Sequence, residues 1–151
     1  MKAQRLISRR ARQIEIEEYQ LPEVGPESVL IANQLTGVSV GTEIQCWLHG
    51  GEPGGPPSFP RTTGYCSTGT VLQVGSSVAT VEPGQRVAAH GYHASHQVVD
   101  RYYYPVPDNV APEDAVFQVM GAISMHGMRR AQVQLGEAVA ILGMGLVGQL
   151  A

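Results

Sequence analysis

The fold is decided by the stretch Ala138-Val139-Ala140-Ile141-Leu142-Gly143-Met144-Gly145-Leu146-Val147-Gly148. Its first half is an apolar run without alternation, which is typical of a strand buried on both faces. In the glycine pattern that follows, the first glycine permits a tight turn, the second lets the backbone approach a pyrophosphate, and the third packs a helix against the strand. We therefore predict the opening of a dinucleotide-binding βαβ unit rather than a plain turn. Its cofactor-binding residues would be Gly143, Gly145, Leu146, Val147 and Gly148.

Only three residues follow this glycine loop. The acidic residue that binds the ribose lies roughly 20 residues beyond such a motif, which is past Ala151. We therefore expect an incomplete nucleotide domain, with no catalytic activity and no measurable dinucleotide affinity for these 151 residues by themselves. An apolar strand without neighbours is an association liability, so it should pair across a homodimer, pack on the rest of the chain or be disordered.

Upstream of the loop, 18 glycines and 10 prolines punctuate short β-branched segments. Short strands at this spacing predict a small barrel or sandwich. The expected strands are 14–17, 28–36, 69–74, 86–89, 97–99 and 104–106, with an exposed loop at 50–57. After Pro107 the pattern changes, because Pro112 and two acidic residues begin a helical stretch with apolar side chains at helical spacing. A second helical stretch is expected over 123–131.

Composition excludes several classes of partner. Ten basic and 13 acidic residues give a net charge of −3, so no basic face able to neutralise several phosphates can form, and we expect no nucleic-acid partner. The apolar runs are far shorter than the roughly 20 residues that span a bilayer, so no membrane partner is expected. With only two cysteines and no secretory signal at the start, a cytoplasmic protein is the default interpretation.

Four segments carry a resemblance to a known family. They are Gly37–Glu43, Phe59–Val71, Val74–Val78 together with Pro83–Val87, and Gly121–Gly127. In this order, followed by the glycine loop, they resemble the medium-chain dehydrogenase/reductase family. The resemblance implies a mainly β fold with a GroES-like barrel as catalytic domain (1–108), a helical connection (109–135) and the first strand and glycine loop of a truncated NAD(P)-binding Rossmann domain (136–151).

The departures from the family pattern concern its zinc site. Zinc-dependent members hold the catalytic metal with a cysteine, a histidine and a neighbouring glutamate, and the matching positions here are Val40, Tyr65 and Cys66. Valine has no donor atom and tyrosine is a poor zinc ligand at neutral pH. No cysteine follows Cys66, so the structural zinc lobe is also missing. We expect NAD or NADP as cofactor, no zinc and no metal site.

Without zinc, the chemistry would depend on polar groups around the nicotinamide. The resemblance places Thr42 where a hydroxyl contacts the substrate oxygen and relays protons, although a local turn role is an equal alternative. Glu43 would support the site through hydrogen bonds. Tyr65 could donate to a developing oxyanion, or it could simply fill the space left by the metal.

The remaining histidines and cysteines suggest less chemistry. We interpret His90, His93 and His96 as loop histidines near a cleft or at the surface rather than as a metal site. Cys46 and Cys66 are interpreted as small apolar residues rather than nucleophiles.

The sequence thus predicts the N-terminal catalytic part of a zinc-independent oxidoreductase acting on a small alcohol or carbonyl substrate. A quinone or enoyl reductase of the same family and a non-catalytic GroES-like module remain alternatives.

Overall fold

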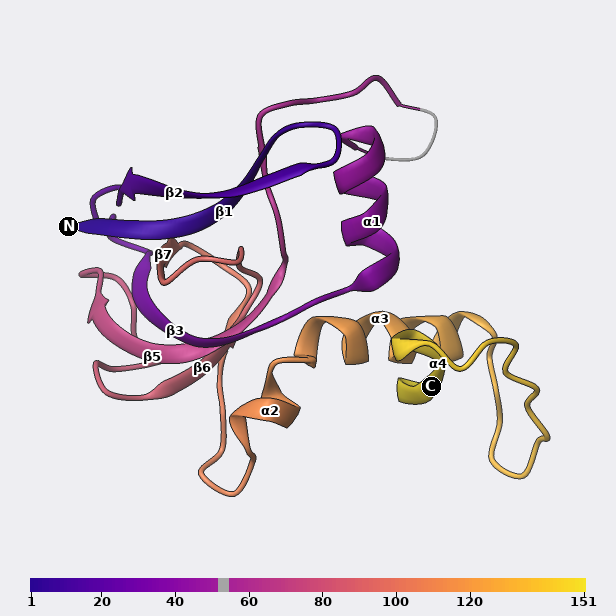
Figure 1. The fold of residues 1–151 in the computed structure, drawn as a ribbon. Coiled ribbons are helices and arrows are strands. Elements are labelled where there is room, and N and C mark those ends of the chain that lie inside the picture. Colours follow the sequence, from indigo (N-terminus) through magenta and orange to yellow (C-terminus); the bar gives the residue numbers. More distant parts are fainter. Residues whose placement is uncertain (52–54) are drawn as a thin grey trace.

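The computed structural model describes residues 1–51 and 55–151, so residues 52–54 of the predicted loop lie outside the described residues. The described part is mainly β, as expected, with helices at its C-terminal end (Figure 1). The strands form a five-stranded sheet in the order β7-β3-β5-β6-β8 and a three-stranded sheet in the order β2-β1-β4. All the strand pairs are antiparallel.

The larger sheet carries the core. Its strands are β3 (Val29–Gly37), β5 (Cys66–Val74), β6 (Arg86–Ala89), β7 (His96–Val99) and β8 (Tyr103–Pro105). Val29 and Ile31 are fully buried because they point to the same face of β3, and they pack with Val71 and Val87 from the neighbouring strands. All five strands overlap segments predicted from sequence, since their alternation and glycine punctuation are local signals.

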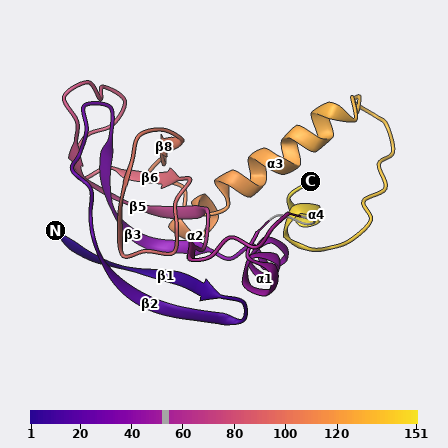
Figure 2. The same ribbon diagram turned by 90° about the horizontal axis from the view of Figure 1, so that it is seen from above.

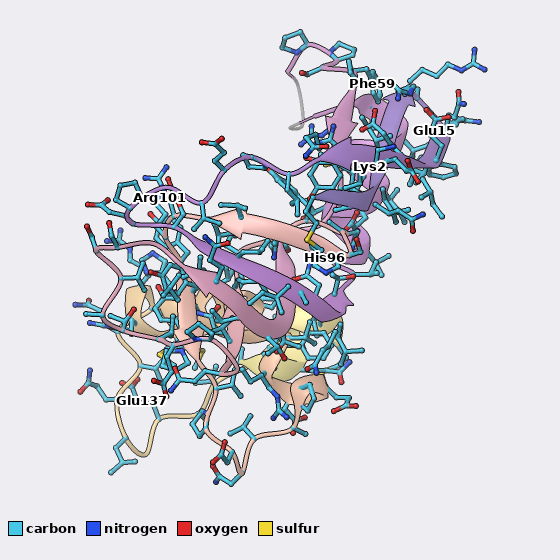
Figure 3. All side chains as sticks on the ribbon, turned by 90° about the vertical axis from the view of Figure 1, so that its left-hand side faces the viewer. Lys2, Glu15, Phe59, His96, Arg101 and Glu137 are labelled. Atoms are coloured by element: carbon cyan, nitrogen blue, oxygen red, sulfur yellow. The ribbon has the colours of Figure 1, made fainter. Side chains whose placement is uncertain are left out.

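The smaller sheet contains β1 (Lys2–Arg10), β2 (Gln13–Gln20) and the two-residue strand β4 (Arg61–Thr62). The sequence predicted residues 14–17 of β2 but not β1. The β1 segment is rich in basic residues, and its apolar residues do not alternate regularly with polar ones. Its charges are matched across the pair, with Arg5 Nη2 2.7 Å from Glu17 Oε2 and Arg9 also contacting Glu17. Figure 3 shows Lys2 and Glu15 of this hairpin far from Glu137 in the C-terminal segment.

Backbone hydrogen bonds join the two sheets. The amide of Leu6 donates to the carbonyl of His93 at 2.8 Å, and the amide of Ser95 donates to the carbonyl of Gln4 at 2.8 Å. The segment before β7 therefore extends the pairing of β1, and Figure 2 shows the β1–β2 hairpin lying beside the larger sheet.

The first helix, α1 (Val40–His49), was not predicted. Its beginning, Val38-Ser39-Val40-Gly41-Thr42, is β-branched and contains glycine, which lowers helix propensity. The helix ends at Gly50, which has a φ of 75° and donates its amide hydrogen to the carbonyl of Cys46. Its position matters for function because it begins beside the glycine loop.

The predicted helical region forms α2 (Pro112–Ala115) and α3 (Gln118–Arg130), and a short α4 (Leu146–Leu150) follows the glycine loop. α4 lies against α3, where Ser124 Oγ donates to the carbonyl of Val147 at 2.9 Å (Figure 1). Within the described ranges, no helix combines the length and apolar character needed to cross a membrane.

The expected buried strand at 138–142 is wrong. These residues are in no strand, and Val139, Ile141 and Leu142 are 46%, 42% and 94% exposed. A strand requires a hydrogen-bonded neighbour, and among the described residues none pairs with this segment. The apolar segment therefore has no regular secondary structure and no paired strand among the described residues.

Candidate active site

Two cavities meet at the residues that the sequence singled out. The first, here called the barrel cavity, has a volume of about 810 Å³ and is lined by Thr42, Glu43, Cys46, Thr63 and Tyr65, among others. The second, here called the loop cleft, has a volume of about 850 Å³ and lies between the start of α1, α3 and the glycine loop 143–148. Thr42, Tyr65 and Ile123 line both. The structure thus brings two of the three predicted catalytic residues to the junction of the cavities.

Thr42 is exposed in the first turn of α1. Its hydroxyl oxygen accepts a hydrogen bond from Ser39 Oγ at 3.5 Å, which is a long contact. The hydroxyl therefore retains capacity both to donate and to accept in the cavities. This capacity is what a residue that passes a proton to or from a substrate oxygen requires.

Glu43 is turned away from the junction into a buried hydrogen-bonded group. Its Oε1 lies 2.9 Å from His93 Nε2, and His93 Nδ1 lies 2.7 Å from Thr36 Oγ1. The side chains of His93 and Glu43 are only 8% and 15% exposed. His93 is thus a loop histidine, as expected, but it is buried and hydrogen-bonded at both nitrogens. The group anchors the first turn of α1, so Glu43 takes a supporting position beside Thr42.

Tyr65 sits between the cavities with its phenol directed at Met120. The hydroxyl donates to Met120 Sδ at 2.8 Å, and Met120 is buried. Because a thioether is a weak acceptor, a substrate oxygen would be a better partner for this O–H group. The ring lies 6.0 Å from that of His90, at an interplanar angle of 30°.

The glycine loop makes a tight turn before α4. Gly143 has a φ of 100°, which a side chain would strain, and a Cβ on Gly148 would overlap the carbonyl oxygen of Gly143. At Gly145, by contrast, a Cβ would meet no atom within 4 Å. The middle glycine therefore leaves open space for a group lying close to the backbone. Leu146 and Val147 begin α4, which holds the loop against α3.

The residues at the family's zinc positions do not fit a zinc ion. Val40 offers no donor, and the Tyr65 hydroxyl is directed at Met120. Cys66 is 1% exposed, and burial raises the pKa of its thiol to about 11, which disfavours the thiolate that zinc requires. Within the described residues, no three His, Cys, Asp or Glu side chains cluster in a way that could hold a metal ion.

Sequence reasoning missed Arg61 and Thr63, which line the barrel cavity. Both lie in the segment Phe59–Val71 that carries the family resemblance, but at positions to which the resemblance assigns no role, so they become notable only through burial. The one sequence feature that could have pointed to this stretch is Gly64, between Thr63 and Tyr65, because a glycine can mark a turn or a close approach of two backbone segments. Gly64 has a φ of 86°, and a Cβ there would press on His93.

Comparison with known proteins places this geometry in context. No protein-family model matches the chain. The chain is 29% identical to the sorbitol dehydrogenase of Bos taurus over 167 residues, which cover 89% of the chain and 47% of the relative. It thus spans about half the length of the curated relatives that it matches.

Solved structures share the fold. Galactitol-1-phosphate dehydrogenase from Escherichia coli superposes with a TM-score of 0.85 at 20% identity, covering 97% of this chain and 50% of that one. The NADP(H) complex of CAD from Helicobacter pylori has a TM-score of 0.85 at 16% identity, covering 99% of this chain and 54% of that one. In sequence and in fold, the chain is thus similar to alcohol dehydrogenase-like proteins of the medium-chain dehydrogenase/reductase family.

Proposed function

We propose that this chain is the substrate-binding part of a zinc-independent, NAD(P)-dependent oxidoreductase acting on a small alcohol or carbonyl compound. The observation that carries the proposal is the junction of the two cavities at Thr42 and Tyr65. The loop cleft would hold the dinucleotide and the barrel cavity the substrate, so the reacting atoms would meet between them. The similarity to sorbitol dehydrogenases and to a structure complexed with NADP(H) supports this assignment.

The bound nicotinamide would supply the acceptor or donor of a hydride. The protein would have to bind the substrate carbon at the junction and to manage the proton on its oxygen. Thr42 is suited to that task because its hydroxyl, which accepts from Ser39 Oγ, can also accept the alcohol proton while donating its own to solvent. Tyr65 would exchange its weak sulfur partner for the substrate oxygen and stabilise negative charge on it. Glu43, held by His93, would fix the turn that carries Thr42.

The glycine loop would bind the pyrophosphate through its backbone. The open space at Gly145 permits the approach, and the close packing of Gly148 on Gly143 preserves the turn. The 151 residues contain this loop but no acidic residue after it to bind a ribose. We therefore expect no measurable NAD(P) affinity for the chain by itself, and calorimetric titration showing micromolar binding would contradict this expectation.

A spectrophotometric screen of the full-length protein tests the function. We expect NAD(P)-dependent oxidation of small alcohols that survives exhaustive treatment with a chelator. Thr42→Val should lower kcat at least tenfold with an unchanged fold, because it removes the hydroxyl and keeps the shape. Thr80→Val is the matched control, since Thr80 is exposed and lines neither cavity among the described residues.

Three results would redirect the proposal. Loss of activity on chelation, restored by zinc, would overturn zinc independence. Turnover of enones with NADPH and none of alcohols would indicate a quinone or enoyl reductase. An absence of turnover with every substrate would favour a non-catalytic GroES-like module. A homodimer and a cytoplasmic location stay predictions, to be tested by sedimentation and by cell fractionation.

A further inference from the structure

Arg61 brings a positive charge to the barrel cavity and forms no ion pair among residues 1–51 and 55–151. It lies in β4, where it pairs with Ser8 of β1, and its Nη1 donates to the carbonyl of Gly50 at 2.8 Å. Its Nε is buried and donates to no acceptor within the described residues. An unsatisfied buried donor destabilises the fold, and a charged one does so more strongly.

Thr63 adds a second unsatisfied group on the same wall. Its side chain is 4% exposed, and its hydroxyl oxygen is buried without a hydrogen-bond partner among the described residues. Residues two apart in an extended segment point to the same side, so Arg61 and Thr63 share a direction. Both line the barrel cavity, as does Tyr65 two positions further on.

Among the described residues, the other acidic and basic side chains that line this cavity, Arg5 and Glu43, each have a partner within the protein. Arg5 is paired with Glu17 at 2.7 Å, and Glu43 with His93 at 2.9 Å. No ion pair involves Arg61 within the described part of the chain. The cavity therefore has an unmet demand for a negatively charged acceptor. A carboxylate or phosphate group meets it, since it accepts from a guanidinium and from a hydroxyl together.

We propose that the substrate carries an acid group, bound by Arg61 and Thr63, while its alcohol or carbonyl carbon lies at Thr42 and Tyr65. This inference rests on the proposed function, because it takes the barrel cavity as the substrate site. Arg61 and Tyr65 are four residues apart, a backbone span of at most ~14 Å, and the chain turns between them at Gly64, so a short molecule can reach both. The substrate is thus a short hydroxy acid or a short phosphorylated alcohol, which the volume of about 810 Å³ accommodates.

Binding to the 151-residue chain tests this without any dinucleotide. Glycerol 3-phosphate, glycerate and neutral glycerol would each be titrated calorimetrically and by amide chemical shifts. We expect at least one acid to bind at least tenfold more tightly than glycerol, with shifts at Thr63 and Tyr65. The tighter of the two acids then identifies the group as a phosphate ester or a carboxylate.

Substitutions of Arg61 and Thr63 test whether the acid binds at these two residues. Arg61→Gln should weaken acid binding at least tenfold, Thr63→Val should weaken it severalfold, and Arg130→Gln on the exposed end of α3 should leave it unchanged. If Arg61→Gln does not fold, Arg61→Lys keeps the charge but loses the planar fork, and should weaken binding by a smaller factor. Circular dichroism reports the fold of each variant.

The inference is overturned if neither acid binds more tightly than glycerol, or if acid binding survives Arg61→Gln in a folded variant. Its failure is distinguishable from that of the proposed function. If the full-length enzyme oxidises neutral alcohols but the 151-residue chain binds no acid, only this inference is contradicted. If acids bind at Arg61 but the full-length protein has no dehydrogenase activity, only the proposed function is contradicted.

Discussion

The buried thiol of Cys66 makes the folded state sensitive to alkaline pH. Burial raises its pKa from an ordinary value of 9.0 to about 11, because the charged form is poorly solvated beside Gly37 and the start of β5. The folded chain therefore favours the protonated thiol more strongly than the unfolded chain does. The resulting stability is fully present below pH 9 and is lost as the pH rises through 11.

We expect this thiolate linkage to remove up to about 3 kcal/mol of unfolding free energy above pH 11, at about 1.4 kcal/mol per pKa unit. Urea unfolding between pH 8 and 11 measures it. Other groups titrate in this range, so Cys66→Ala is the reference, and its stability should fall less steeply with pH. Parallel pH profiles for the two proteins would contradict the assignment. Cys46 is less buried and should remain the faster of the two thiols to alkylate.

Gly64 lines the barrel cavity between Thr63 and Tyr65 and packs closely against His93. Its φ of 86° suits glycine, and a Cβ would stand 2.8 Å from the amide nitrogen of His93. We expect Gly64→Ala to destabilise the fold by at least about 1–2 kcal/mol, the cost of left-handed backbone for an alanine. Thermal unfolding measures this, with Gly84→Ala as a control: Gly84 has a φ of 93° but no neighbour near its Cβ. Equal losses at both glycines would show that crowding at His93 contributes nothing.

At the scale of the element, α1 is a helix held by its ends. None of its ten residues, all within the described ranges, is fully buried, and Val40, Ile44 and Trp47 form an exposed apolar stripe. Its first turn is tied to the barrel by the pair of Glu43 with His93. Its last turn is tied by the carbonyl of Gly50, which accepts from Arg61. The helix that carries Thr42 thus depends on polar contacts.

Removing the contact between Glu43 and His93 should destabilise α1. In His93→Phe the ring volume stays but the Glu43 carboxylate loses its partner in a poorly solvated site, so we expect a loss of about 1–3 kcal/mol. Amide hydrogen exchange should accelerate in α1 before it does in β3 and β5. His96→Phe, at a partly exposed strand position, serves as control. Unchanged protection of α1 in His93→Phe would show that the helix is held by other contacts.

At the scale of the whole molecule, the C-terminal segment leaves apolar side chains in solvent. Leu135 and Leu142 are almost fully exposed, and Ile141 and Val147 are more than 40% exposed. Figure 1 shows the segment looping away from the sheets before it returns to α3. Contiguous exposed apolar surface of this kind marks an interaction site or an aggregation liability.

We expect concentration-dependent association of the 151-residue chain through this surface. Leu135→Lys with Leu142→Lys should shift the sedimentation profile toward the monomer without lowering the unfolding temperature, because neither side chain packs in the fold. Leu72→Lys, at an exposed position of β5, tests whether any added charge has the same effect. Association that persists in the double variant would place the contact elsewhere, for instance on the stripe of α1.

The sequence by itself determined the features whose signals are local. Alternation and glycine punctuation predicted the strands of the larger sheet, and the spacing of Gly143, Gly145 and Gly148 predicted the loop, because a strand face or a tight turn depends on neighbouring residues. Matching segments also brought Thr42, Glu43 and Tyr65 forward as site residues. Where they meet, however, was not readable from the chain.

Tertiary structure decided everything that depends on partners distant in sequence. β1 is held by backbone pairing with β4 and with His93 and by the burial of Ile7. The expected strand at 138–142 fails because no neighbour among the described residues offers it hydrogen bonds. The same reason governs the site: His93 contacts Glu43 across 50 residues. Arg61 becomes a candidate anion ligand only because folding buries its Nε with no acceptor among the described residues. Burial and pairing are properties of the assembled fold, which no local pattern encodes.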